Sequence, residues 1–164
     1  MSIVLDIFRT YRAPREVQAR RMDGPPREDR ALAVLLGACA LIYVAQWPRF
    51  SREAFLDASV SVEARMAGGL FAWLMVMPLV FYALSLALAL VARAAGRPIS
   101  GYACRMALFW GLLASTPLWL LSGLLAGFAP GSGLAIVSSA ALLAVVVFTA
   151  AGLMTARAGH MRQA

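Results

Sequence analysis

The sequence predicts an all-α membrane protein, a bundle of four transmembrane helices preceded by an amphipathic helix. The chain runs for 51 residues from Met106 to Ala156, and for 27 residues from Met66 to Ala92, without Asp, Glu, Lys, Arg or His. A helix with a solvent-exposed face carries charges every turn or two, whereas a helix surrounded by lipid does not need them. The 164 residues are 62% hydrophobic and only 14% charged, which leaves room for one membrane domain and no separate catalytic domain.

The N-terminal segment, residues 1–30, contains the amphipathic helix. One helical face is apolar and the other is charged. The apolar positions are Ile3, Val4, Ile7, Phe8 and Tyr11, and the charged positions are Asp6, Arg9 and Arg12. Such a helix lies in the plane of the lipid head groups. The alternative is a helix packed on the cytoplasmic ends of the bundle. Pro14 ends or bends this helix, and Pro25 and Pro26 stop the short helical stretch that follows.

The first two spans are bounded by charges and proline. The first is Ala31 to Trp47, followed by Pro48. The second, Met66 to Ala92, would be about 40 Å long as an ideal helix, which exceeds a hydrocarbon core of about 30 Å. We therefore expect it to tilt, to protrude or to bend at Pro78. The connection between them, residues 48–65, is predicted to hold a short helix on the outer interface, with a solvated loop as the alternative.

The uncharged stretch of 51 residues holds two crossings and one turn. The third span is Met106 to Phe128 and contains Pro117. Residues 129–133, Ala-Pro-Gly-Ser-Gly, form a turn. The fourth span is Leu134 to Ala156. The predicted organisation is thus a cytoplasmic segment 1–30, a transmembrane domain 31–156 and a cytoplasmic tail 157–164.

The distribution of arginine predicts the orientation. In the four-span arrangement twelve Arg lie on one side of the membrane and three on the other. The twelve are Arg9, Arg12, Arg15, Arg20, Arg21, Arg27, Arg30, Arg93, Arg97, Arg105, Arg157 and Arg162, and the three are Arg49, Arg52 and Arg65. Because cytoplasmic loops carry the excess of positive charge, both termini are predicted to be cytoplasmic. All 15 cations are Arg and Lys is absent, a composition typical of a GC-rich bacterium, so the expected location is the bacterial inner membrane.

The predicted spans lack the side chains that intramembrane catalysis uses. None contains an ionisable residue, which argues against proton-coupled transport, a catalytic carboxylate pair and an intramembrane metal site. His160 is interpreted as a residue of a solvated tail, and Cys39 as a small packing residue. We expect no catalytic, cofactor-binding or metal-binding residue. The net charge is +7, and the arginines that produce it flank the predicted spans and do not form one basic face. We therefore expect lipid head groups as partners, and we do not expect nucleic acid.

Candidate interaction residues are small, hydroxylated or proline residues within the spans, together with the N-terminal cations. Gly123 and Gly127 form a small-xxx-small pair, which suits close helix packing inside the bundle or in a dimer. Ser115 and Thr116 precede Pro117, and we expect them to satisfy freed backbone groups, with a polar substrate pocket that includes Ser122 as the alternative. The predicted packing residues are Gly123, Gly127, Pro78, Pro117, Ser115 and Thr116, and the predicted ligands of anionic lipid are Arg9, Arg12, Arg15, Arg20 and Arg21.

Three short motifs resemble the bacterial branch of the Yip domain family of small polytopic membrane proteins. They are Tyr-Arg-Ala-Pro-Arg-Glu at residues 11–16, Met-Pro-Leu at 77–79 and Ala-Ser-Thr-Pro-Leu at 114–118. The resemblance covers about residues 10–155. Eukaryotic members of this family are named for interaction with Rab-type GTPases. The resemblance implies a non-enzymatic membrane protein that acts through other proteins or lipids, and it transfers no catalytic residue.

These observations leave three functional hypotheses. The leading one is an accessory, structural or assembly subunit that binds other subunits of a larger inner-membrane complex. The second is a carrier or channel for a neutral or apolar small molecule, built around the second and third spans. The third is a membrane-shaping protein that acts through its N-terminal amphipathic helix.

Overall fold

The computed structural model describes residues 2–96 and 99–161, and all regular structure in these residues is helical. The helices are α1 (Ile3–Arg12), α2 (Pro14–Met22), α3 (Glu28–Ala45), α4 (Trp47–Leu56), α5 (Val62–Phe71), the π-helical segment η1 (Ala72–Val76), α6 (Met77–Ala94), α7 (Gly101–Ala114), α8 (Thr116–Phe128) and α9 (Ser132–Met161). Arg97, Arg162 and the side chain of His160 lie outside the described part of the chain.

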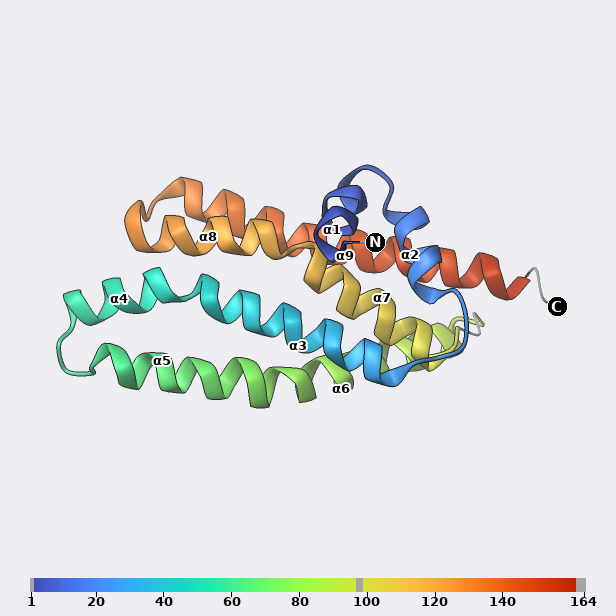
Figure 1. Cartoon of the computed structure of the whole chain (residues 1–164), viewed down its shortest axis with the longest axis horizontal. Coiled ribbons are helices and arrows are strands. Elements are labelled where there is room, and N and C mark those ends of the chain that lie inside the picture. The colour runs from blue at the N-terminus through green and yellow to red at the C-terminus, as the bar shows by residue number, and fades with distance from the viewer. Residues whose placement is uncertain (1, 97–98, 162–164) are drawn as a thin grey trace.

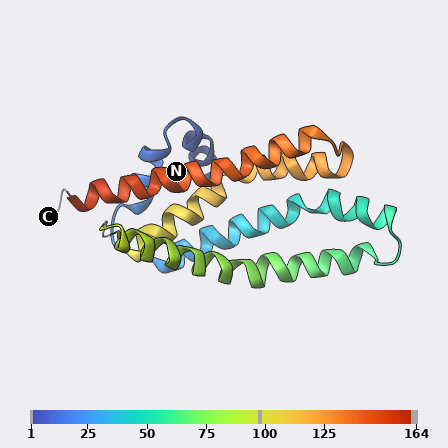
Figure 2. The ribbon, with the colours of Figure 1, turned by 180° about the vertical axis from the view of Figure 1, so that it is seen from behind.

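The long helices run side by side and form an elongated bundle (Figures 1 and 2). The α4–α5 and α8–α9 turns lie at one end, which we call the turn end. The start of α3, the end of α6, the start of α7 and the end of α9 lie at the other end. Arg105 at the start of α7 forms a bidentate ion pair with Glu28 at the start of α3, which joins two helices at that end.

The bundle contains helices that are long and apolar enough to cross a membrane. Three continuous helical stretches meet this description, Glu28–Leu56, Val62–Ala94 and Ser132–Ala158. The pair α7 and α8 meets it only together, with a bend of 43° between the two helices. The described residues therefore contain three candidate spans, or four if the bent pair is one span.

The chain between the first two spans differs from the predicted interfacial helix. After one turn at Gln46, α4 extends the same rod as α3, and Figure 1 shows the two nearly in line. Pro48 permits this because it occupies the first turn of α4, where its missing N–H is not needed. The turn itself is residues 57–61. There Arg65 forms ion pairs with Asp57 and Glu53, and hydrogen bonds from Ser59 with the nearby charge of Arg65 lower the pKa of Asp57.

The second span accommodates its proline by local widening. Helix α6 begins at Met77, directly before Pro78, and the five residues of η1 precede it. The N–H of Met77 donates to the carbonyl of Ala72, five residues earlier. Pro78 has no N–H to continue the α-helical ladder, and a π-helical segment is one way in which a long helix absorbs such an interruption.

The stretch predicted as one third span, Met106 to Phe128, is divided between two helices with a bend between them. Helix α7 ends at Ala114, and α8 starts at Thr116 with Pro117 in its first turn. The hydroxyls of Ser115 and Thr116 donate to the carbonyls of Leu112 and Leu113 at 2.7 and 2.8 Å, which satisfies backbone groups at the break. Both hydroxyls are thus used within the chain, as the structural interpretation of these residues expects.

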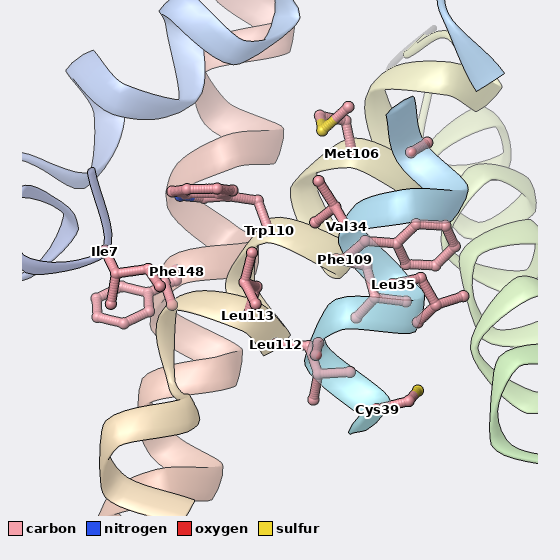
Figure 3. Close-up of a cluster of buried hydrophobic side chains, with 14 of the residues drawn as sticks. Ile7, Val34, Leu35, Cys39, Met106, Phe109, Trp110, Leu112, Leu113 and Phe148 are labelled. Carbon is pink, nitrogen blue, oxygen red and sulfur yellow. The ribbon is translucent and has the colours of Figure 1, made fainter. Parts of the chain in front are cut away.

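Helix α7 lies at the centre of the hydrophobic core. Eleven of its 14 residues are buried, among them Phe109 and Trp110, which are fully shielded. Figure 3 shows these two side chains pointing to opposite sides of α7, with Phe109 toward Val34 and Leu35 of α3 and Trp110 toward the N-terminal hairpin. Around α7 are α1, α2, α3, α6 and α9.

Candidate functional site

The first two helices form a hairpin that packs across α7 and α9 (Figures 1 and 2). Its contact with the bundle is polar and buried, which is unusual in so apolar a chain. In α1, the buried residues are Asp6, Ile7 and Thr10, and in α2 they are Val17 and Gln18. Buried polar groups need partners because desolvation without a hydrogen bond costs several kcal/mol, roughly 2 to 7.

Asp6 forms the central ion pair of the hairpin. Its Oδ2 accepts a hydrogen bond of 2.5 Å from Nη2 of Arg21, and Nη2 of Arg20 lies 3.9 Å from Oδ1. The side chains of Asp6 and Arg21 are only 8% and 11% exposed. Each therefore neutralises a charge that would otherwise be poorly solvated, and the pair fastens α1 to α2.

Trp110 joins the hairpin to the centre of α7. Its Nε1 donates to the hydroxyl oxygen of Thr10 at 3.1 Å, and that hydroxyl donates to the carbonyl of Asp6 at 2.7 Å. The guanidinium carbon of Arg21 lies 4.2 Å from the centre of the indole ring, a cation–π geometry. The tryptophan thus contacts Thr10 with its edge and Arg21 with its face.

Gln18 inserts between α7 and α9. Its Nε2 donates to the carbonyls of Ala107 and Phe148 at 3.4 and 3.3 Å, while its Oε1 has no hydrogen-bond partner among the described residues. Gly152 makes room for it, since a Cβ at that position would lie 2.9 Å from the Gln18 amide and 2.7 Å from Cβ of Ala107. The Gln18 amide therefore occupies space that only a glycine at position 152 leaves open.

The hairpin presents apolar side chains outward. Ile3, Val4, Leu5 and Phe8 are all more than half exposed, while the polar Asp6 and Thr10 face the bundle. Apolar side chains thus lie on both sides of α1, because Ile7 is buried against the bundle, and the exposed surface also carries Arg9 and Arg12. The sequence interpretation offered lipid contact and packing on the bundle as alternatives, and this helix has a face for each.

The hairpin contacts the second half of α9. Tyr11 makes an edge-to-face contact with Phe148, their ring centres 5.1 Å apart. Phe148 precedes Arg157, the first charge of the tail, by nine residues, about 13 Å along a helix. Partial burial raises the pKa of Tyr11. The exposed apolar side chains of α1 suit contact with lipid.

The five N-terminal arginines are placed in different surroundings. Arg20 and Arg21 face Asp6, so the structure turns Arg21 toward the protein and away from a head group. Nη2 of Arg15 lies 3.4 Å from Sδ of Met154, while Arg9 and Arg12 are exposed on α1. Of the five predicted lipid ligands, Arg9, Arg12, Arg15 and Arg20 are exposed, whereas the side chain of Arg21 is only 11% exposed.

Gly123 and Gly127 lie where α8 crosses α3 and α4. A Cβ on Gly123 would lie 1.8 Å from the carbonyl oxygen of Ala45, and one on Gly127 would lie 2.4 Å from Cβ of Pro48. The close approach is thus made within the chain, by backbone that cannot move aside independently. Pro78 and Pro117 each lie in the first turn of a helix, as described above.

The sequence analysis did not predict that Thr10, Gln18 and Trp110 join the hairpin to the bundle. A signal was present, because Thr10 and Asp6 share the polar face of α1, four residues apart, and Gln18 stands among charged residues of α2. What the sequence could not show is that this polar face meets a tryptophan from the middle of an apolar span.

No group of three or more His, Cys, Asp or Glu side chains is arranged to hold a metal ion in the described residues, and Cys39 and Cys104 are both free and buried. No protein-family model, curated protein or solved structure matches this chain.

Proposed function

We propose that this chain is a non-enzymatic integral protein of the bacterial inner membrane that acts by contact, as an accessory or assembly subunit of a larger membrane complex. Its cytoplasmic termini, the resemblance to the Yip family and the absence of a cofactor are parts of the same proposal. The arginine count supports the orientation, and the absence of ionisable residues from the predicted spans supports a role without catalysis.

The observation that carries the proposal is the exposure of the span formed by α5, η1 and α6. In its most apolar 18-residue window only 11% of residues are buried, against 39% and 28% in the spans Glu28–Leu56 and Ser132–Ala158. One edge of α6 packs on the core, through Tyr82, Ser85 and Ala89 among others. The rest of the span is left for lipid or for another protein.

The outward face of α6 combines small and large apolar residues, as helix-packing surfaces in membranes do. Ala83 and Ala87, one turn apart, are exposed and are flanked by the exposed Leu79, Leu86 and Leu90. Small residues one turn apart let a second helix approach closely, and in a bilayer this packing is a main source of association. The face therefore supports docking of a transmembrane helix from a partner subunit.

The proposal is tested by enlarging these small residues in the full-length protein. Ala83→Phe and Ala87→Phe should weaken co-purification of a partner after extraction in a mild detergent, because disrupted packing costs about 1 to 3 kcal/mol, a factor of roughly 5 to 150 in affinity. Ala135→Phe, at an exposed position on α9, is the matched control and should leave the partner bound.

Two results would contradict the proposal. One is a wild-type protein that, gently extracted, runs alone as a monomer. The other is a saturable flux of a small solute into vesicles that contain only this protein, which would favour the carrier hypothesis.

A further inference from the structure

A pocket of about 360 Å³ with several polar side chains in its wall lies at the turn end of the bundle, between α4, α8 and α9. It is independent of the hairpin contact and of the outward face of α6. The polar side chains that line it include Gln46, Arg49, Arg52, Glu53, Trp119 and Ser138. Neither the proposed function nor the hairpin assigns these groups a role.

The charges of the pocket do not cancel within the protein. Glu53 is neutralised, since Nε of Arg49 donates to it at 2.7 Å and Nη1 of Arg65 lies 3.7 Å away. Arg52 is half-buried, and no carboxylate in the described chain lies within ion-pair distance of it. Its hydrogen bond to the carbonyl of Gly127 is long, 3.5 Å from Nη1 to the oxygen. The uncompensated charge of the pocket is therefore positive.

Neutral groups in the wall also lack partners. Nε1 of Trp119 is shielded from solvent and has no acceptor in the described residues. The side chains of Gln46 and Ser138 likewise make no hydrogen bond within the described chain. An indole N–H is only a donor, and a guanidinium carries donors only, so the unmet demand is for acceptor oxygens.

The surroundings of Arg52 indicate an amphiphilic ligand. On its other side lies a cleft of about 520 Å³ whose lining includes the apolar Trp47, Phe55, Met66 and Phe128. Trp47, Phe55 and Phe128 are exposed, by 44%, 88% and 79%, and Phe55 and Phe128 lie at the ends of candidate spans. Exposed aromatic residues at such a level are typical of the interface between membrane and water.

We propose that this pocket binds the phosphodiester head group of an anionic phospholipid, with Arg52 as the ion-pairing residue and an acyl chain in the neighbouring apolar cleft. Guanidinium matches the oxygens of a phosphate in a bidentate geometry, and this pairing is strong where water is partly excluded. The phosphate oxygens of the lipid would accept hydrogen bonds from Arg52, for which the described residues provide only one long hydrogen bond.

Native mass spectrometry of the full-length protein, delipidated in a mild detergent, tests this assignment. The probes are phosphatidylglycerol, phosphatidylcholine and inorganic phosphate, each at the same concentrations. We expect wild-type protein to bind phosphatidylglycerol preferentially. Arg52→Gln should lower that affinity about tenfold or more, as expected for loss of a charged hydrogen-bonded contact.

Three further variants make the result specific. Arg52→Lys keeps the charge but loses the bidentate geometry, so it should bind with intermediate affinity. Trp119→Phe keeps a ring in the wall and removes an N–H that is shielded from solvent, so it should bind like wild type. Arg27→Gln removes a cation at the opposite end, where it pairs with Asp29, and should bind like wild type. Unchanged thermal unfolding would show that each variant is folded.

The assignment is overturned if folded Arg52→Gln binds phosphatidylglycerol like wild type, or if phosphatidylcholine binds equally well. It is also overturned if inorganic phosphate displaces the lipid at matched concentrations, because the site would then be one for a soluble anion.

Discussion

At the scale of single residues, the main feature of this protein is a buried ion pair in a largely apolar chain. Asp6 is a buried carboxylate of α1, and it is paired with Arg21, with Arg20 close by. Arg21 also covers the face of Trp110, so one guanidinium serves two contacts. Removing either member of such a pair leaves the other charge poorly solvated, which costs more than the pair contributes when intact.

This arrangement predicts strong coupling between the two residues. Asp6→Asn and Arg21→Gln should each lower the free energy of unfolding by roughly 3 kcal/mol, since each leaves a buried partner uncompensated. The double variant should lose less than the two single losses together. Thermal unfolding in one fixed detergent measures this cycle. Arg9→Gln, an exposed cation on the same helix, is the control and should change little. Additive losses from Asp6 and Arg21 would contradict the pairing.

At the scale of helices, glycine decides where two helices meet. Gly123 brings α8 against the backbone of α3, whereas Gly37, inside α3, has open space around it, and a Cβ added there would meet no atom within 4 Å. The two glycines thus have opposite roles. One makes a contact possible, and the other only lowers helix propensity.

The contrast gives a prediction for two substitutions to the same residue type. Gly123→Ala should destabilise the protein by at least about 3 kcal/mol, because the new carbon meets the carbonyl of Ala45 and the helices must separate. Gly37→Ala should be neutral or stabilise by up to about 1 kcal/mol. Thermal unfolding and the yield of monodisperse protein in detergent measure both. Equal behaviour of the two variants would show that α8 and α3 do not approach closely in the membrane.

At the scale of the whole molecule, the two ends of the bundle carry different charge. Arg27, Arg93, Arg105 and Arg157 belong to the end where α3 begins and α9 finishes, whereas the turn end has Arg49, Arg52 and Arg65. The turn end has three carboxylates, Glu53, Asp57 and Glu63, as many as its arginines. The excess of positive charge is therefore on the end predicted to be cytoplasmic.

Cysteine labelling tests the orientation of the whole molecule. In a variant with Cys39 and Cys104 replaced by Ala, a cysteine at Ser59 in the α4–α5 turn should react with a membrane-impermeant maleimide added outside intact inner-membrane spheroplasts. A cysteine at Ser2 should react only after the membrane is permeabilised. Labelling of both from the same side would show that the stretch Glu28–Leu56 does not cross the membrane, and would contradict the four-span arrangement.

Much of the fold was predictable because crossing a lipid bilayer is a property of local composition. The apolar stretches around Met66 to Ala92 and Leu134 to Ala156 lie within helices of the structure, extended by a few residues at each end. Pro14 and residues 129–133 also separate helices as predicted. The candidate site was predictable only in its parts, since Asp6 was assigned to a polar face and Arg21 to lipid, without the contact that joins them.

The sequence by itself determined the class of the protein, the approximate limits of its apolar helices and the positions of its helix breaks, because each depends on residues close together in the chain. The tertiary structure alone decided which face of α1 turns inward, that α4 continues α3, that Gln18 fits against Gly152, and that Arg52 lacks a carboxylate. In water, the apolar face of a helix must point inward, and a sequence pattern can reveal that direction. Lipid is as apolar as the protein interior, so the same pattern no longer tells inside from outside, and only the contacts between helices do.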